Sequence, residues 1–259
     1  MEKEIPLTEI ALVIPGHGAT ENRQSSQATR LLVDRLRDLG LFAEVHAAFW
    51  KERPYFKDVF SAIDCSQVYV VPHFISKGYF TQQVIPRELQ LSGRVTERAG
   101  FCIHYCDPVG CHPGMTDLLW RRAVGLCEGL DLAETSLLIV GHGTKRNKDS
   151  AKAVRRQVEK IQAYQGGFGE VLGVYLDESP DLSDWYELTR FQNVVVLPYF
   201  IASGLHFSRD LPAILGMEGG VFEPSCEIRS KKVYCAQSVG GDPAMVDFVI
   251  DLVKGFSAK

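Results

Sequence analysis

The chain lacks several features that would assign it to a specialised class of protein. Its net charge is only −4 over 259 residues, which gives no electrostatic reason to expect nucleic acid or an anionic membrane as a partner. No apolar run approaches the roughly 20 residues that span a bilayer. The first residues, MEKEIPLTEI, do not have the basic and then apolar layout of a secretory leader. We therefore expect an ordinary globular protein of the cytoplasm, with no nucleic-acid or membrane partner.

Cysteine is present, but not in a pattern typical of disulfides or of iron–sulfur clusters. The seven cysteines are an odd number and include no C-x-x-C pair, which indicates reduced thiols in the cytosol. One segment, FCIHYCDPVGCH, is richer in possible ligands: Cys102, His104 and Cys106 share one face of a strand, followed by Cys111 and His112. A structural metal site is one interpretation. Packing is the one we favour, because cysteine often behaves as a small buried apolar residue.

The sequence contains an internal repeat. ALVIPGHGATENR corresponds to LLIVGHGTKRNKD, with His17 over His142, and HAAFWKERP corresponds to LGVYLDESP. VYVVPHFISKGYFTQQVIP corresponds to VVVLPYFIASGLHFSRDLP, and HYCDPVGCHPGMTD to YCAQSVGGDPAMVD. The offset is 125 or 126 residues for three of the pairs and 130 for the fourth. Ordered segments at a near-constant offset indicate a tandem duplication, and we expect two domains, residues 1–130 and 131–259.

Each half alternates short apolar runs with amphipathic segments. The runs predict strands near 10–15, 43–50, 67–73 and 100–106 in the first half, and near 136–141, 171–176, 193–199 and 231–235 in the second. In the first half, residues 24–39 predict a helix that Gly40 ends and that buries Ala28, Leu31, Leu32, Leu36 and Leu39. This alternation predicts an α/β fold of two flavodoxin-like halves, each a parallel sheet with helices on both faces.

The repeated loops gather residues that could bind a metal ion. In parallel sheets ligands bind at the carboxyl ends of the strands. In the second half His142, Asp177 with Glu178, and His206 each follow a predicted strand. Two imidazoles and a carboxylate form a plausible site for a divalent metal and an equally plausible proton-accepting set. The alternatives are a phosphate cradle at the Gly-His-Gly turn, an ordinary loop histidine, and a helix cap formed by Asp177 or Glu178.

A comparison of the two halves favours function for one of these histidines. The first half keeps the Gly-His-Gly turn with His17, but has Phe80 where the second half has His206. The fold therefore does not require histidine at that position. This difference favours a functional role for His206.

These motifs resemble those of a known family. The Gly-His-Gly turn followed by LPYFIASGLHFSRDLP resembles the class II chelatases of the sirohydrochlorin cobaltochelatase and ferrochelatase family, and the resemblance covers nearly the whole chain as two repeats. It implies a chelatase-like fold with the active cleft between the halves. It also implies insertion of Co²⁺ or Fe²⁺ into sirohydrochlorin or a related tetrapyrrole, in cobalamin or siroheme biosynthesis.

The resemblance assigns roles to particular residues. His142 and His206 act together as catalytic residues and metal ligands, and Asp177 or Glu178 is the acidic residue that some members add. The long members keep the histidine pair in the first half, whereas here it is complete only in the second, so the first half has a degenerate site. The metal, Co²⁺, Fe²⁺ or Ni²⁺, is a substrate, no organic cofactor is expected, and the protein is a monomer or a homodimer.

The expected substrate carries eight carboxylates, so cations should line its site. Lys145, Arg146 and Arg209 flank the two motifs of the second half, and Lys77 lies at a matching place in the first. His17 and His73 are further substrate-binding candidates. For His73, whose counterpart is Tyr199, packing is the alternative.

Two rival functions fit parts of the same pattern. A non-catalytic metal or tetrapyrrole carrier could use the same residues. A phosphoryl-transfer enzyme could use a nucleophilic histidine in a glycine-rich turn, but enzymes of the phosphoglycerate-mutase type have an Arg before that histidine. Here Gly16 and Gly141 occupy that place.

Overall fold

The computed structural model describes residues 5–20, 24–143, 149–202, 210–221 and 223–256. The chain divides into two compact units. Unit 1 comprises residues 1–112 and 240–259, and unit 2 comprises residues 113–239. In the described residues, no helix is both long enough and apolar enough to cross a membrane.

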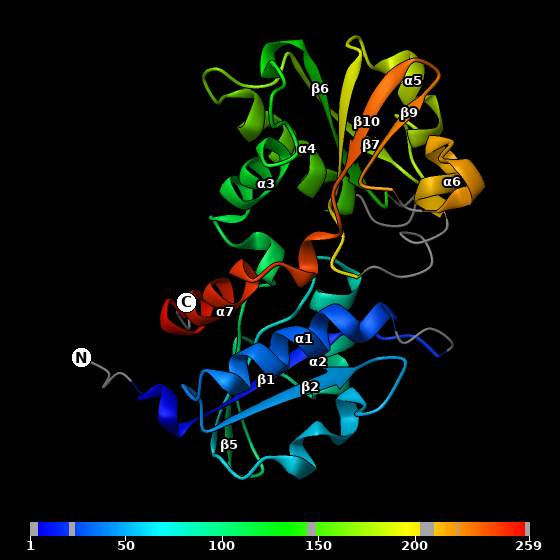
Figure 1. Cartoon of the computed structure of the whole chain (residues 1–259). Helices are drawn as coiled ribbons and strands as arrows, with labels where there is room; N and C mark the ends of the chain where they lie inside the picture. The colour runs from blue at the N-terminus through cyan, green and yellow to red at the C-terminus, as the bar shows by residue number, and fades with distance from the viewer. Residues whose placement is uncertain (1–4, 21–23, 144–148, 203–209, 222, 257–259) are drawn as a thin grey trace. The chain divides into compact units, whose positions relative to one another are not determined.

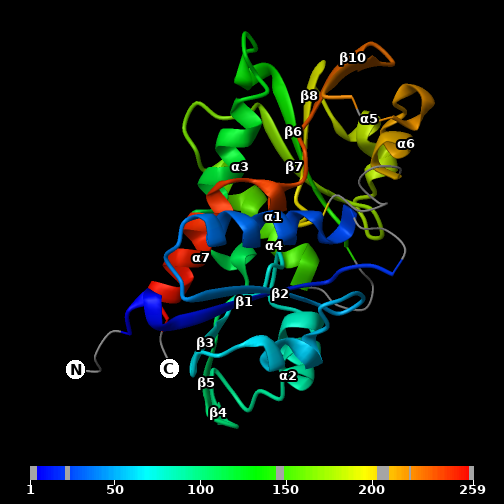
Figure 2. The ribbon, with the colours of Figure 1, turned by 60° about the horizontal axis from the view of Figure 1, so that its bottom comes forward.

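Unit 1 is built on a five-stranded sheet with the order β2-β1-β3-β5-β4. Its strands are β1 (Ile10–Gly16), β2 (Glu44–Phe49), β3 (Gln67–Val70), β4 (Val95–Arg98) and β5 (Phe101–Tyr105). The first three pairings are parallel, and β4 pairs with β5 in the antiparallel sense. Its α-helices are α1 (Gln24–Asp38), α2 (Ile85–Glu88) and α7 (Ala244–Lys254), and a π-helix over Phe80–Val84 leads into α2. Figure 2 shows α1 and α7 on one side of this sheet and α2 on the other.

Unit 2 repeats this plan with the order β7-β6-β8-β10-β9. Its strands are β6 (Thr135–Gly141), β7 (Glu170–Tyr175), β8 (Asn193–Pro198), β9 (Ser225–Ile228) and β10 (Lys231–Cys235). Its helices are α3 (Met115–Val124), α4 (Asp149–Gln162), α5 (Trp185–Leu188) and α6 (Leu211–Leu215). Figure 1 shows α3 and α4 on one side of the sheet and α5 and α6 on the other. Central β6 is buried along its whole length, as expected for a strand covered on both faces.

The eight predicted strands are all present, so the predicted tandem α/β fold is confirmed. The sheets are mostly parallel, and each also has an antiparallel edge strand, β4 or β9, that was not among the predicted strands. Their sequences, VTER and SCEI, are short and partly polar and alternate between buried and less buried positions. An edge strand needs only one apolar face, so it gives a weaker sequence pattern than the buried runs in the centre.

The residues that helix α1 buries against the sheet are fewer than the predicted ones. Ala28, Leu32 and Leu36 are buried, but Leu31 is 40% exposed and Leu39 is 50% exposed. At about 100° per residue, Leu31 lies on the flank of the buried arc. Leu39 follows the last residue of the helix, Asp38, and so does not belong to the helical stripe.

The boundaries of the two compact units differ from the boundaries of the two sequence repeats. Helix α3 ends the first repeat but belongs to unit 2, where it packs on β8 and α4. Thr116 of α3 donates a 2.7 Å hydrogen bond to Gln157 of α4, and Trp120 stacks on Tyr164. Helix α7 ends the second repeat but belongs to unit 1, where it packs on α1. Each repeat therefore contributes its last helix to the unit built on the other repeat's sheet.

Candidate functional site

The turn after β6 brings a histidine and a carboxylate together. Strand β6 ends at Gly141, and His142 follows at the carboxyl edge of the sheet. The carbonyl oxygen of His142 accepts hydrogen bonds from the backbone N–H groups of Leu176 and Asp177, at 3.1 and 3.0 Å. These bonds hold the segment after β7 against the turn. They place Asp177 beside His142.

The two side chains are also in direct contact. Oδ2 of Asp177 lies 3.0 Å from Nδ1 of His142, and the carbonyl oxygen of Gly143 lies 3.2 Å from the same nitrogen. Both partners are acceptors, so in the neutral imidazole the proton is on Nδ1 and the lone pair is on Nε2. The side chains of His142 and Asp177 are 45% and 59% exposed. A carboxylate bonded to the far nitrogen is the usual way in which proteins orient a metal-binding imidazole.

Glu178 lies in a different environment from Asp177. Its Oε1 is 3.8 Å from the guanidinium of Arg155 on α4, and its Cβ lies beneath Gly143. A side chain at position 143 would come within 2.8 Å of that Cβ, and the φ of Gly143 is +67°, a conformation that favours glycine. Glu178 thus supports the turn, whereas Asp177 contacts the imidazole.

The same supporting pair occurs in unit 1. Glu52 pairs with Arg30 of α1 at 3.0 Å, accepts a hydrogen bond from the N–H of Ala19, and packs beneath Gly18, whose φ is +66°. Arg30 and Arg155 each follow the turn histidine by 13 residues. Sequence reasoning missed this pair, although its equal spacing in both repeats could have revealed it.

The residue beside the turn histidine differs between the units. Lys51 of unit 1 donates its backbone N–H to the carbonyl of His17 at 3.1 Å, as Asp177 does to His142. A cationic side chain therefore replaces the carboxylate at this position of unit 1. The turn and its Arg–Glu support are common to both units, but the carboxylate next to the imidazole is specific to unit 2.

Four predicted site residues lie outside the described part of the chain. These are His206, Lys145, Arg146 and Arg209. Their counterparts in unit 1 supply a partial comparison for the histidine. Phe80, the counterpart of His206, has its ring centroid 4.7 Å from that of His17 in an edge-to-face arrangement. Nδ1 of His17 lies 2.8 Å from the carbonyl oxygen of Gly18, so the turn histidines of the two units make the same local contact.

His73 is an interior residue. It is 2% exposed, and its Nδ1 lies 2.9 Å from the hydroxyl of Thr29. Burial lowers the pKa of His73 to about 3 because removal from water penalises the charged imidazolium. Its counterpart Tyr199 is equally buried. Both positions pack between the sheet and the helix, which favours packing over substrate contact for His73.

The cysteine-rich segment contributes to packing in unit 1. His104 stacks on Tyr69 with centroids 4.3 Å apart, and its Nε2 lies 3.4 Å from the sulfur of Cys102. Burial raises the pKa of the Cys106 thiol to about 12, and His112 stacks on Phe248. Among the residues that the structure describes, no group of three or more His, Cys, Asp or Glu side chains could hold a metal ion.

Comparison with known proteins gives one family for both repeats. The family model described as CbiX matches residues 11–125 and again residues 136–255. The chain is 36% identical over 262 residues to a protein of Halobacterium salinarum described as a probable sirohydrochlorin cobaltochelatase. That match covers 93% of this chain and 89% of the relative.

Solved structures agree on the fold. A multi-domain protein of Deinococcus radiodurans, described as structurally similar to chelatases with two additional domains, matches with a TM-score of 0.78 and 27% identity. That match covers 94% of this chain but 54% of the other, so this chain spans about half of that protein's length. A protein described as CbiX, the terminal enzyme of siroheme biosynthesis in denitrifying bacteria, matches with a TM-score of 0.70 and 21% identity, covering 95% of this chain and 98% of the other.

Proposed function

The chain belongs to the CbiX family, and from that premise we propose that it is an enzyme that inserts a divalent metal ion into the tetrapyrrole sirohydrochlorin. The relative from Halobacterium salinarum is described as a probable sirohydrochlorin cobaltochelatase. The site that we assign to the reaction is the carboxyl edge of the sheet of unit 2. There His142 and His206 bind the ion, and Asp177 orients His142.

One observation carries this assignment. The positions equivalent to 142 and 206 in unit 1 are 17 and 80, and their rings lie 4.7 Å apart. The repeat uses the same turn in both units, so the same separation in unit 2 would bring two imidazoles close enough to share one ion. Unit 1 has a phenylalanine and a lysine where unit 2 has His206 and Asp177. The complete set of donors therefore belongs to unit 2, since unit 1 keeps His17 but neither of the other two.

The chemistry follows from the tautomer of His142. With Nδ1–H bonded to Asp177 at 3.0 Å, Nε2 presents its lone pair to the ion in place of a water molecule. Two imidazoles are fewer ligands than the four of a closed structural site. The ion is therefore held with positions left for the pyrrole nitrogens, and it can be passed on.

Insertion also releases two pyrrole N–H protons, and the same imidazoles can accept them. Once the ion passes to the macrocycle, the lone pair on Nε2 of each histidine is available for one proton. The Asp177 carboxylate stabilises the imidazolium that forms at His142. Two protons leave the ring and one divalent ion enters it, so charge is balanced. Glu178 supports the turn through Arg155 and takes no direct part.

The proposed metal is Co²⁺, because the Halobacterium salinarum relative is described as a cobaltochelatase; Fe²⁺ and Ni²⁺ suit the same donors. The proposed location is the cytoplasm, where thiols stay reduced. The reaction needs no organic cofactor, nucleic acid or membrane, and a monomer or a homodimer could perform it.

The test is turnover of sirohydrochlorin with Co²⁺, followed by the change in the absorbance of the macrocycle. We expect several equivalents of product per enzyme, which a carrier would not give. His142→Ala and His206→Ala should each lower the rate at least about 100-fold, as expected for loss of general acid–base catalysis. The matched control is His46→Gln, because His46 also pairs with a carboxylate, Glu44 at 2.8 Å, but lies within β2. A near wild-type rate for His206→Ala would show the assignment to be wrong.

A further inference from the structure

Unit 1 carries an aromatic cluster at the strand edge where unit 2 carries its candidate metal site. Phe80 is at its centre. The rings around it lie at centroid distances of 4.7, 5.7, 5.9 and 6.5 Å and belong to His17, Tyr79, Phe74 and Trp50. His17 is exposed and Tyr79 is 50% exposed. The cluster therefore presents aromatic surface to solvent at the place where a ligand of this fold binds.

These aromatic residues are largely specific to the first repeat. The second repeat has Leu176 at the position of Trp50, Leu205 at the position of Tyr79 and His206 at the position of Phe80. A fold requirement would have kept aromatic residues in both copies. The difference indicates that the first repeat has a binding surface of its own.

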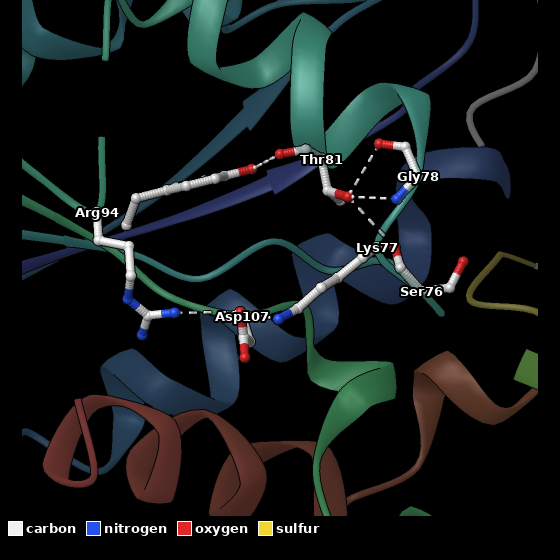
Figure 3. A network of polar contacts seen from close by, with 7 residues as sticks. Ser76, Lys77, Gly78, Thr81, Arg94 and Asp107 are labelled. Atoms are coloured by element: carbon white, nitrogen blue, oxygen red, sulfur yellow. Dashed lines mark hydrogen bonds and ion pairs between the residues drawn. The ribbon is translucent and has the colours of Figure 1, made fainter. Parts of the chain in front are cut away.

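The segment that carries this surface, where residues 76–78 lead into the π-helix Phe80–Val84, is held by its own hydrogen bonds. The hydroxyl of Thr81 accepts a 2.9 Å hydrogen bond from the N–H of Gly78 and lies 3.3 Å from the carbonyl oxygens of Ser76 and Gly78 (Figure 3). The hydroxyl of Tyr105 in β5 donates to the carbonyl oxygen of Thr81. A segment fixed in this way loses little conformational entropy when a ligand binds. The second repeat has Phe207 and Cys235 at the positions of Thr81 and Tyr105, so it lacks both hydroxyl groups.

One member of a pair of cations, Lys77, belongs to the same segment as Tyr79 and Phe80. Lys77 lies 2.8 Å and Arg94 lies 3.5 Å from the same oxygen of Asp107, and Figure 3 shows them reaching it from two sides. Two cations share one carboxylate, so the group carries a net charge of about +1. The Lys77 side chain is 50% exposed, and it lies two residues from Tyr79. An anionic group on a flat ligand could reach both residues.

We propose that this edge of unit 1, formed by Tyr79, His17, Phe80 and Lys77, is a metal-free binding platform for the macrocycle. The proposal rests on the proposed function, because a planar ring system with eight carboxylates is the ligand that combines both requirements. The exposed rings of Tyr79 and His17 contact the face of the macrocycle. Lys77, oriented by Asp107, pairs with one of its carboxylates. Phe80 fills the position of a second imidazole, so no ion is held there.

The test measures binding of metal-free sirohydrochlorin to the full chain, by quenching of protein fluorescence. Tyr79→Ala should raise the Kd about tenfold and Lys77→Gln about fivefold. Matched controls are Leu39→Ala, which changes a residue with the same 50% exposure, and Arg37→Gln, which removes an exposed cation paired with Asp34. Both controls should bind within twofold of wild type.

Salt dependence separates a charge contact from a merely structural role. The Lys77 pair should weaken as salt rises, so Lys77→Gln should reduce the salt dependence of the Kd, whereas Tyr79→Ala should leave it unchanged. Wild-type affinity in both Tyr79→Ala and Lys77→Gln would overturn the platform. In that case continued turnover with Co²⁺ would leave the proposed function standing. A wild-type chain that neither binds sirohydrochlorin nor inserts metal would overturn both proposals.

Discussion

Replacing Phe80 by histidine should give unit 1 a metal site that it does not have. The rings of His17 and Phe80 are 4.7 Å apart with their planes at 67°. With metal–nitrogen bonds of about 2.1 Å and a ring nitrogen about 1.1 Å from its centroid, a shared ion lies about 3.2 Å from each centroid. The two bonds then meet at about 94° for this separation, between the roughly 90° of an octahedral site and the roughly 109° of a tetrahedral one. The separation is therefore compatible with a shared ion once side-chain rotation turns one nitrogen of each ring towards it.

Two effects oppose binding in the single variant. Phe80 packs against Trp50 and Phe74, and its loss should cost about 1–3 kcal/mol of stability. Lys51 also stands where unit 2 has Asp177. A carboxylate about 6 Å from a divalent ion contributes about 1.4 kcal/mol in water-like surroundings, which is about tenfold in affinity. Phe80→His combined with Lys51→Asp should therefore bind at least about tenfold more tightly than Phe80→His alone.

The assay is a Co²⁺ titration of the full chain without tetrapyrrole, followed by the visible absorbance of the bound ion. Wild type should bind one ion, Phe80→His two, and the double variant two with higher affinity. Phe74→His is the matched control, because it places an imidazole in the same cluster at a position that does not correspond to His206. If Phe80→His is folded and binds only the wild-type number of ions, positions 17 and 80 do not reproduce the site, and the reasoning from one repeat to the other fails.

Three other predictions test the remaining parts of the structure. Asp177→Asn should weaken Co²⁺ binding about 10–100-fold. Glu178→Gln should change Co²⁺ binding less than twofold and lower the free energy of unfolding by at most about 1 kcal/mol. Co²⁺ titration and urea denaturation check these values, and a larger loss of Co²⁺ affinity in Glu178→Gln than in Asp177→Asn would contradict the assigned roles. Burial lowers the pKa of His73 to about 3, so its neutral form stabilises the fold above the unfolded pKa near 6.5, and this contribution is lost as pH falls from about 6.5 towards 3. Between pH 7 and 5 wild type should lose about 2 kcal/mol more than His73→Gln, and equal losses in urea denaturation would show that His73 does not titrate in this way. Deleting residues 240–259 removes α7 from unit 1, so hydrogen exchange should accelerate in β1 and α1 but not in β6 and α4; equal acceleration in both units would contradict the division of the chain.

The choice between Asp177 and Glu178 shows where sequence reasoning stopped. Two adjacent carboxylates at the end of a strand are equivalent in a pattern, because alternation tells only that they point in different directions. The structure separates them through tertiary contacts. Asp177 contacts His142, and Glu178 pairs with Arg155 from a helix that follows the turn.

Helix α1 shows a similar limit for packing. The periodicity correctly placed Ala28, Leu32 and Leu36 in the core, because those residues form a narrow stripe on the helix. It could not place Leu31 and Leu39, which are exposed. Whether a residue at the margin of such a stripe is buried depends on how the helix is rotated on the sheet and on where the helix ends.

By itself, the sequence determined the duplication, the eight strands of the two sheets and the position of His142 at a strand end, because apolar periodicity and turn residues act locally. The tertiary structure alone decided which carboxylate meets the imidazole, that β4 and β9 run antiparallel, and that α3 and α7 join the unit built on the other repeat's sheet. The two repeats have similar apolar patterns, so these patterns do not tell on which sheet the last helix of each repeat packs. The sheet on which α3 or α7 packs becomes known only from the tertiary structure.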